Sequence, residues 1–242
     1  MIRTGIGGWD FDGWRGSFYP PGLPRTRQLA WAAEHLGAIE INATYYKTQS
    51  PALFEAWAAH VPDGFKFAIK GSRFCSNRKD LAGAGEAVAR FCGQGLSALG
   101  DRLGPVLWQL MDSKKFDAAE MQAFFALLPR AVDGVALSHV IEARHPSFAD
   151  PAFAALAAEA GVGVAYADTG LGLAQVGGGV AYARLQGTRE DEPQGYCPAA
   201  LDGFAEQARG WAAAGAREVY LFVIGGAKVR NPAAAMALAE RV

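Results

Sequence analysis

The stretch Val140-Ile-Glu142-Ala-Arg144-His145-Pro146 combines a short apolar run with charged residues at its end. A run of about five to seven apolar residues has the length of a buried parallel strand. Similar runs recur along the chain, at residues 3–8, 38–42, 65–70, 106–110, 162–168, 180–186 and 219–224. Together with residues 140–144, these runs predict eight strands.

Helical patterns separate the predicted strands, and several begin with recognisable capping residues. These helix starts are Ser50-Pro51, Asp117 with Glu120, Asp150-Pro151 and Asn231-Pro232. Eight strand–helix alternations predict an α/β fold, a TIM-type (β/α)8 barrel with allowance for irregular strands, rather than a doubly wound Rossmann-type sheet. Because no linker divides residues 1–242, we expect a single domain.

Composition excludes several broad classes of protein. The chain is 51% hydrophobic and 19% charged with a formal net charge of −1, so it has no global attraction for nucleic acid, and any polyanion binding must be local. Its three cysteines form no CxxC pattern and predict neither a disulfide framework nor a zinc site. We expect a cytoplasmic protein with no membrane span; the oligomeric state is not predicted.

Polar residues end nearly every predicted strand. In a TIM-type barrel the catalytic face lies at these carboxyl ends, and a charge within a buried strand costs several kcal/mol unless it is paired or reaches the mouth. We therefore predict a ligand pocket at the mouth. Its binding residues are Trp9, Asn42, Tyr45, Lys70, Gln109, Arg144, Asp168, Arg184 and Gln186. The alternative is that Glu40, Lys70, Glu142 and Arg144 form ion pairs that only brace the barrel mouth.

The candidates for proton transfer are Glu142, His145 and Glu40. Glu142 and Arg144 are two residues apart, so both lean to one face of a strand, where they can pair or share a ligand. His145 could act as a general acid or base near neutral pH, or could equally cap the strand end. If the protein is an enzyme, these residues suggest a hydrolase or lyase that uses acid–base chemistry without a histidine metal centre.

No metal or cofactor is predicted. His35 and His60 fall near helix ends, and His139 lies at the start of its strand, away from the mouth. A carboxylate-bound Mg²⁺ at Glu40, Glu142 or Asp168 would be chemically reasonable, but no ligand spacing supports it.

The loop Gly225-Gly226-Ala-Lys228-Val-Arg230 is a candidate phosphate-binding site. It precedes a helix N-terminus, where backbone N–H groups and the helix dipole favour an anion, and barrels often bind phosphate after the last two strands. Glycines are also common at ordinary loop bends, which is the alternative interpretation. Aromatic residues at the first two strand ends, from Trp9 to Tyr19 and at Tyr45 and Tyr46, predict either a lid over the ligand or a small separate core.

Five motifs along the chain resemble the YecE-like family, domain of unknown function 72. They are Gly8-Trp9 with Trp14-Arg-Gly-Ser-Phe18-Tyr19-Pro20, Glu40-Ile-Asn42-Ala-Thr-Tyr45-Tyr46, Phe65-Lys-Phe67-Ala-Ile-Lys70, Gly104-Pro-Val-Leu-Trp-Gln109-Leu110 and Glu142-Ala-Arg144-His145-Pro146. The resemblance spans almost the whole chain. It implies a TIM-type barrel with a polar pocket at its strand ends, and it implies no particular activity.

The chain also departs from the family pattern. Leu110 is followed by Met111-Asp112 where the family often has Pro-Pro, and Leu185-Gln186-Gly187 replaces the family's Leu-His-Gly. The asparagines that commonly end the eighth strand, and a histidine that commonly follows the strand-three lysine, are also missing. These differences predict altered chemistry in the pocket.

Three functions fit these observations. The first is binding of, or action on, a small anionic ligand, for example a phosphorylated one, at the carboxyl-terminal face of the barrel. The second is a nucleic-acid-binding or repair-like barrel analogous to endonuclease IV, although the missing metal-ligand histidines and the net charge oppose it. The third is a non-catalytic ligand-binding protein, which the loss of the Leu-His-Gly histidine favours.

Overall fold

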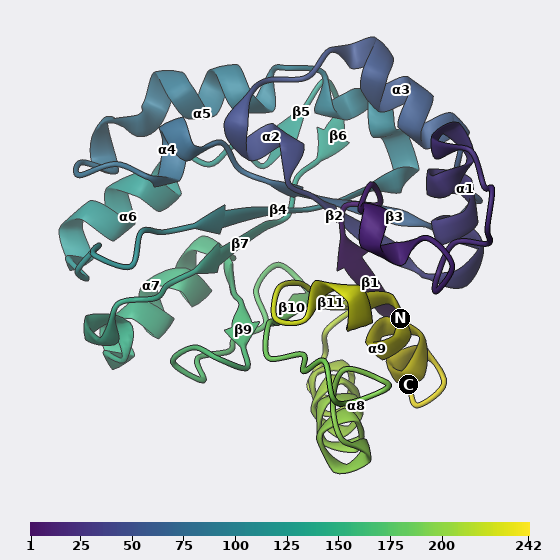
Figure 1. The fold of residues 1–242 in the computed structure, drawn as a ribbon. Coiled ribbons are helices and arrows are strands. Elements are labelled where there is room, and N and C mark those ends of the chain that lie inside the picture. Colours follow the sequence, from purple (N-terminus) through teal and green to yellow (C-terminus); the bar gives the residue numbers. More distant parts are fainter.

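The strands form one parallel sheet that curves into a nearly closed barrel in the computed structural model, which describes residues 1–242 (Figure 1). Hydrogen-bonded neighbours follow the order β8-β7-β4-β3-β2-β1-β11-β10-β9. The strands are β1 (Ile2–Gly7), β2 (Ala38–Ile41), β3 (Lys66–Lys70), β4 (Leu103–Gln109), β7 (His139–Glu142), β8 (Gly163–Val164), β9 (Tyr166–Ala167), β10 (Val180–Leu185) and β11 (Glu218–Val223). The predicted fold class, a TIM-type barrel, is confirmed.

The barrel closes at its least regular segment, residues 163–167. β8 pairs with β7 and β9 pairs with β10, so this one stretch of chain joins the two ends of the sheet. The prediction of one continuous strand over residues 162–168 was wrong. Val164 exchanges backbone hydrogen bonds with Gln175 of the following loop, at 2.9 and 3.0 Å, so β10 can pair only with Tyr166 and Ala167.

Two other strand boundaries differ from the prediction by more than one residue. β4 begins at Leu103 rather than at residue 106. The pairing of β3 with β4 shifts its register between Leu103 and Val106, and this shift lets Gly104 and Pro105 lie within the strand. A side chain at Gly104 would lie 2.9 Å from the Phe67 carbonyl oxygen, so glycine permits this close approach. β7 ends at Glu142, which leaves Arg144 just beyond the strand.

A small antiparallel hairpin was not predicted. It joins β5 (Ala131–Val132) to β6 (Val135–Ala136). Asp133 and Gly134 form its turn with φ values of 47° and 79°. Asp-Gly is a strong sequence signal for a two-residue hairpin turn, so the signal was present in the chain.

Helices surround the barrel (Figure 1). They are α1 (Arg25–His35), α2 (Ala43–Tyr46), α3 (Pro51–Ala59), α4 (Arg73–Ser76), α5 (Gly85–Cys92), α6 (Ala118–Ala126), α7 (Pro151–Ala160), α8 (Pro198–Ala213) and α9 (Asn231–Ala239), with short 3-10 turns at Asp12–Trp14, Ala82–Ala84, Leu96–Arg102, Pro146–Phe148 and Lys228–Arg230.

Most predicted helix starts are confirmed by their caps. The side chains of Ser50, Asp117 and Asp150 accept hydrogen bonds from backbone N–H groups in the first turns of α3, α6 and α7. The capping box at Asp117 is incomplete, because the Glu120 carboxylate turns away to accept from the backbone N–H of Leu81. Asn231 begins α9, but its side chain contacts Thr188 instead of capping the helix.

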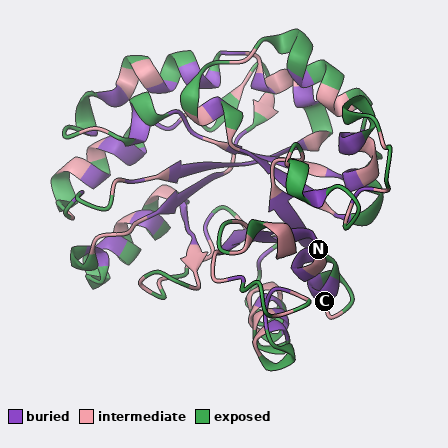
Figure 2. Cartoon of the chain, in the orientation of Figure 1, coloured by how far each residue is buried: buried purple, intermediate pink, exposed green.

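Two groups of apolar side chains stabilise the fold. The larger lies between the strands and the helices, so the helices are buried on the side facing the barrel and exposed on the other (Figure 2). The smaller fills the barrel interior with Ala38, Ala68, Leu107, Val140, Ala165, Val180, Tyr182, Tyr220 and Phe222. The apolar interior leaves the mouth as the place where polar side chains can converge.

Candidate active site at the barrel mouth

Five polar side chains follow the apolar interior layer at the mouth. Each stands two residues after an inward-facing residue of the same strand, and strand alternation therefore directs it to the same side. The inward pairs are Ala38 and Glu40, Ala68 and Lys70, Leu107 and Gln109, Val140 and Glu142, and Tyr182 and Arg184. Strands β2, β3, β4, β7 and β10 thus supply one polar layer.

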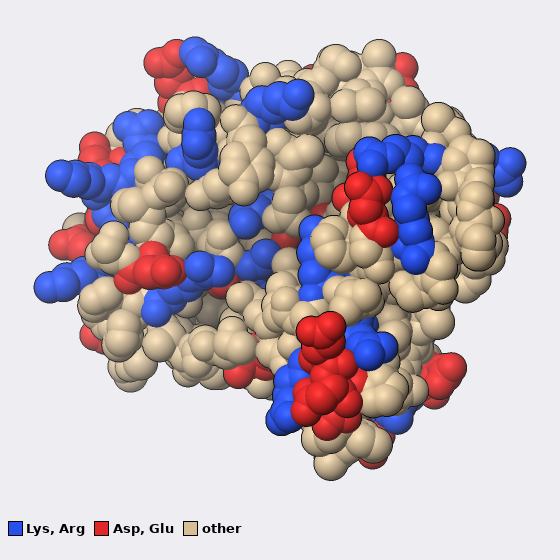
Figure 3. Space-filling view, viewed as in Figure 1, with Lys and Arg blue, Asp and Glu red and all other residues tan.

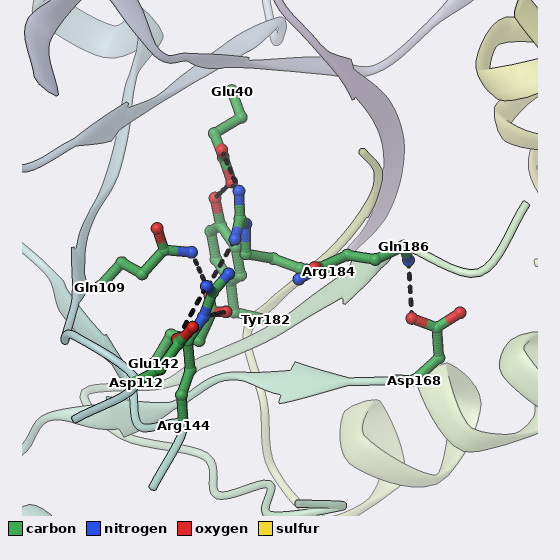
Figure 4. Close-up of polar contacts among 9 residues, drawn as sticks. All are labelled: Glu40, Gln109, Asp112, Glu142, Arg144, Asp168, Tyr182, Arg184 and Gln186. Carbon is green, nitrogen blue, oxygen red and sulfur yellow. Dashed lines mark hydrogen bonds and ion pairs between the residues drawn. The ribbon is translucent and has the colours of Figure 1, made fainter. Parts of the chain in front are cut away.

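Arg184 is the centre of this layer (Figure 4). Its guanidinium binds the Glu40 carboxylate through two N–H groups, Nε to Oε2 at 3.0 Å and Nη2 to Oε1 at 3.1 Å. A third N–H, on Nη1, donates to Glu142 Oε2 at 2.6 Å. The three residues are 3%, 0% and 2% exposed. Buried carboxylates of this kind are stable only when paired, so Arg184 holds two strands of the mouth together.

Glu142 has two further partners at the edge of this cluster. Gln109 Nε2 and Arg144 Nε each donate to its carboxylate at 2.9 Å, and Arg144 Nη1 also donates to Asp112 at 3.1 Å. Burial would raise the pKa of Glu142, but the Arg184 and Arg144 guanidiniums lower it to about 2. Glu142 is therefore ionised near neutral pH and carries no proton to donate.

Lys70 differs from the other cations of the mouth. Its amine forms no ion pair or hydrogen bond with the protein, and it lies 4.6 Å from the centre of the Tyr45 ring. Burial and the nearby Arg184 charge lower the pKa of Lys70, although Glu40 and Glu142 act in the opposite direction. The mouth therefore contains one lysine amine whose hydrogen-bonding capacity is unused.

A cavity of about 270 Å³ lies beside this cluster. Its lining includes Glu142, Arg144, Asp112, Thr169 and Gln186. Figure 3 shows lysine and arginine atoms in the hollow at the middle of this face, with acidic atoms visible among them. Larger hollows lie elsewhere, against α8 and beneath the barrel near His139, but no cluster of buried charges opens into them. The mouth cavity is thus the one that adjoins the charged layer.

Asp168 lies at the edge of the mouth, and its carboxylate is hydrogen-bonded to groups of the protein itself. Its carboxylate accepts from the backbone N–H of Gln186 at 2.6 Å (Figure 4). It also accepts from the backbone N–H of Gly187 at 3.0 Å and from the Tyr196 hydroxyl at 2.7 Å. These bonds hold the chain after β10 in place. Asp168 is therefore positioned to shape the wall of the cavity, in which Gln186 takes part.

Three other predicted site residues lie apart from the charged cluster. The Trp9 ring packs edge-to-face on Trp57 at 5.4 Å, so it belongs to the packing around the first loop. Asn42 precedes α2 and donates to the Glu40 carbonyl oxygen at 3.4 Å. His145 accepts from the backbone N–H of Ser147 at 3.1 Å and so caps the turn Pro146–Phe148. Of the two alternatives for His145, the geometry favours the cap.

The side chains of the predicted phosphate loop do not converge. The Lys228 amine lies 4.5 Å from the centre of the Phe11 ring, and Arg230 donates to the Glu190 carbonyl oxygen at 3.1 Å. Gly225 and Gly226 take φ values of 101° and 54°, and a side chain at Gly226 would lie 2.5 Å from Thr188 oxygens. These glycines therefore serve the packing of the loop on residue 188.

The structure also identifies residues that the sequence interpretation missed. The buried Tyr182 hydroxyl donates to Glu40 Oε2 at 2.7 Å. Its position two residues before Arg184 was a usable signal, because both must face the barrel interior. Asp112 was noted only as a departure from the family pattern, yet it binds Arg144. Tyr196 comes from a distant loop, and no local pattern indicates its contact with Asp168.

The carboxylates considered for Mg²⁺ do not form a common site. Glu40 and Glu142 both bind Arg184, whereas Asp168 binds backbone N–H groups on another segment. No three His, Cys, Asp or Glu side chains are grouped so that they could hold a metal ion. His139 is buried between the Trp108 indole N–H and the Pro129 carbonyl oxygen.

None of the helices has both the length and the apolar character needed to cross a bilayer.

The fold and the charged layer define a TIM-type barrel protein with a polar site at the carboxyl ends of its strands. Residues 3–242 match the model of a family described as protein of unknown function DUF72. The chain belongs to this family. The resemblance inferred from the five motifs is thereby confirmed.

Solved structures show the same fold. A DUF72 family protein from Thermotoga maritima is 22% identical with a TM-score of 0.76, covering 99% of this chain and 97% of that one. Another, from Enterococcus faecalis, is 17% identical with a TM-score of 0.75, covering 99% and 94%. SacUVDE is 10% identical with a TM-score of 0.58, covering 100% of both chains. At these identities the likeness concerns the fold alone.

A sequence relative is similar over a shorter segment. UPF0759 protein YunF of Bacillus subtilis is 32% identical over 71 residues, which are 29% of this chain and 24% of that protein. The match spans about a quarter of the length of this relative.

Proposed function

We propose that the protein binds a small anionic ligand, such as a phosphorylated or carboxylated metabolite, at the barrel mouth. The observation that carries this proposal is the unpaired amine of Lys70 beside a rigid layer of paired charges. An anion placed against Lys70 and Arg144 would supply the partner that the amine lacks within the protein. Arg144 contributes because its Nη2 group donates to no protein atom.

The charge balance of the mouth supports an anion. Three cations, Arg184, Arg144 and Lys70, face two buried carboxylates. Asp112 and Asp168 add two negative charges at the edge of the site. The Asp112 side chain is 80% exposed, so solvent and salt screen its charge. Asp168 is held by backbone N–H groups and the Tyr196 hydroxyl. The inner part of the site therefore carries a positive excess, in a partly buried setting where charge–charge attraction is stronger than in water.

Glu40 and Glu142 fit a positioning role better than proton transfer. Each carboxylate accepts three hydrogen bonds from side chains, and Glu142 stays ionised down to a pH of about 2. Within this proposal, Lys70 serves as the cation that binds the anion. Burial and the neighbouring Arg184 charge lower the pKa of Lys70, and a bound anion would oppose that shift.

Binding can be tested by thermal denaturation at low ionic strength with inorganic phosphate, pyrophosphate and citrate, each against sodium chloride of matched ionic strength. A ligand at 100 times its Kd stabilises the folded state by about 2.7 kcal/mol, which is about 5–10 °C in Tm for a domain of this size. We expect at least one probe to raise Tm in this way.

Variants locate the site. Lys70→Met and Arg144→Gln should abolish the increase in Tm, whereas Lys228→Met, in the competing loop, should retain it. An increase that persists in both mouth variants would contradict the proposal, as would the absence of any specific shift in the wild-type protein. The unliganded Tm of each variant provides the control for folding.

A further inference from the structure

Two exposed aromatic rings flank the barrel mouth. Tyr46 is 64% exposed at the end of α2, and Phe74 is 60% exposed in α4. All other aromatic side chains of the protein are buried or half-buried. These two helices follow β2 and β3, which are neighbours in the sheet, so both rings stand on adjacent loops of the same face. An exposed aromatic pair at a functional face indicates an interaction surface.

The Phe74 ring borders a groove of about 570 Å³ that is rich in arginine. Arg73 forms no ion pair and lies over the Phe74 ring at 5.2 Å. Arg78 donates only to backbone carbonyl oxygens, whereas Arg90 is paired with Glu86 at 2.9 Å. Figure 3 shows lysine and arginine side chains gathered over the region that α4 and α5 occupy in Figure 1.

Tyr45 lies between a residue of this groove and Lys70 of the barrel mouth. The Asn77 amide donates to the Tyr45 hydroxyl at 3.5 Å, and Asn77 also lines the groove. On its other side, the Tyr45 ring contacts the Lys70 amine. Exposed Lys47 adds a further cation without a carboxylate partner beside Tyr46. Cations and aromatic rings therefore lie close to one another on the surface formed by α2 and α4.

We propose that this α2–α4 surface, formed by Tyr46, Lys47, Arg73, Phe74, Asn77 and Arg78, binds single-stranded nucleic acid. Flat exposed rings can stack on bases of any sequence, and the neighbouring cations can contact the phosphates. An acidic peptide would use the cations but gives the rings no flat partner. The proposal goes beyond ligand binding at the mouth and does not depend on it.

The test is fluorescence anisotropy with a labelled oligodeoxythymidine of about 12 nucleotides at low salt, a length in the range that such surfaces cover. We expect binding that weakens about tenfold or more between 50 and 200 mM salt, because about three cations would contact phosphates. Tyr46→Ala and Phe74→Ala should each weaken binding about tenfold at constant salt. Arg73→Gln should weaken it and also reduce the salt dependence.

Arg27→Gln is the matched control, because Arg27 is exposed on α1 and forms no ion pair. It should leave oligonucleotide affinity unchanged. No binding at 20 mM salt would overturn the proposal. Equal affinity for a polyglutamate peptide, or unchanged binding in Tyr46→Ala and Phe74→Ala, would also overturn it by showing a purely electrostatic surface. The melting temperature of each variant checks its folding.

Discussion

The charged layer of the barrel mouth and the loop Gly225–Arg230 both place cations at the ends of strands, yet they differ in how those cations are held. Arg184 is buried and bound to two carboxylates from strands across the barrel. The Lys228 amine instead lies over an aromatic ring, and Arg230 donates to a backbone carbonyl oxygen. Strand alternation makes side chains converge, whereas a loop directs each side chain separately.

The largest effect expected from this comparison is on stability. Arg184→Met leaves the Glu40 and Glu142 carboxylates buried without their main partner, which should cost about 3–5 kcal/mol in the free energy of unfolding. Lys228→Met should cost less than about 1 kcal/mol, because it removes only an accessible cation–π contact. Urea denaturation at pH 7 measures both.

Similar losses of stability in the two variants would show that Arg184 is bound no more firmly than Lys228. The pH dependence of Arg184→Met gives a second test. In Arg184→Met, lowering the pH toward 5 should recover part of the lost stability, because protonation removes the unpaired buried charges.

The next effect is the pH dependence that Glu142 confers. Its pKa is about 2 in the folded protein against an ordinary value of 4.5, so the unfolded chain binds more protons between these values. The stabilisation is therefore complete above about pH 4.5 and is lost as pH falls toward 2, amounting to about 3 kcal/mol. Unfolding free energies of the wild type and Glu142→Gln should converge over this window. Parallel pH profiles would show that Glu142 is not held by the arginines.

The smallest effect concerns His145. Because its ring accepts a backbone N–H at the start of the turn Pro146–Phe148, His145→Ala should cost no more than about 1 kcal/mol. Anion-induced shifts in Tm should be the same as in the wild type. If His145→Ala abolished those shifts without changing stability, His145 would be shown to take part in anion binding.

Much of the fold followed from the sequence because buried strands have a simple pattern. All eight predicted runs contain a strand, but the run 162–168 is divided, because Gln175, eleven residues beyond Val164, pairs with it from a loop. Local hydrophobicity carries no information about such a loop contact. The hairpin at Asp133-Gly134 was missed although its turn signal was present.

The charged layer could be predicted to the same extent. Glu40, Lys70, Gln109, Glu142 and Arg184 are brought to one layer because each lies at an inward position of its strand. The partners of residues on loops could not be predicted. The cap formed by His145, the packing of Trp9 on Trp57 and the contacts of Lys228 depend on the path of the chain between elements. The binding and proton-transfer roles of these residues remain predictions.

The most direct test of the account is a crystal of the wild-type protein soaked in selenate, with anomalous scattering to locate the anion. We predict a selenate peak at the mouth, with oxygens about 2.7–3.2 Å from Lys70 Nζ and an Arg144 Nη atom, which disappears in Lys70→Met. A peak confined to the loop Gly225–Arg230, or a mouth without bound anion, would contradict the account.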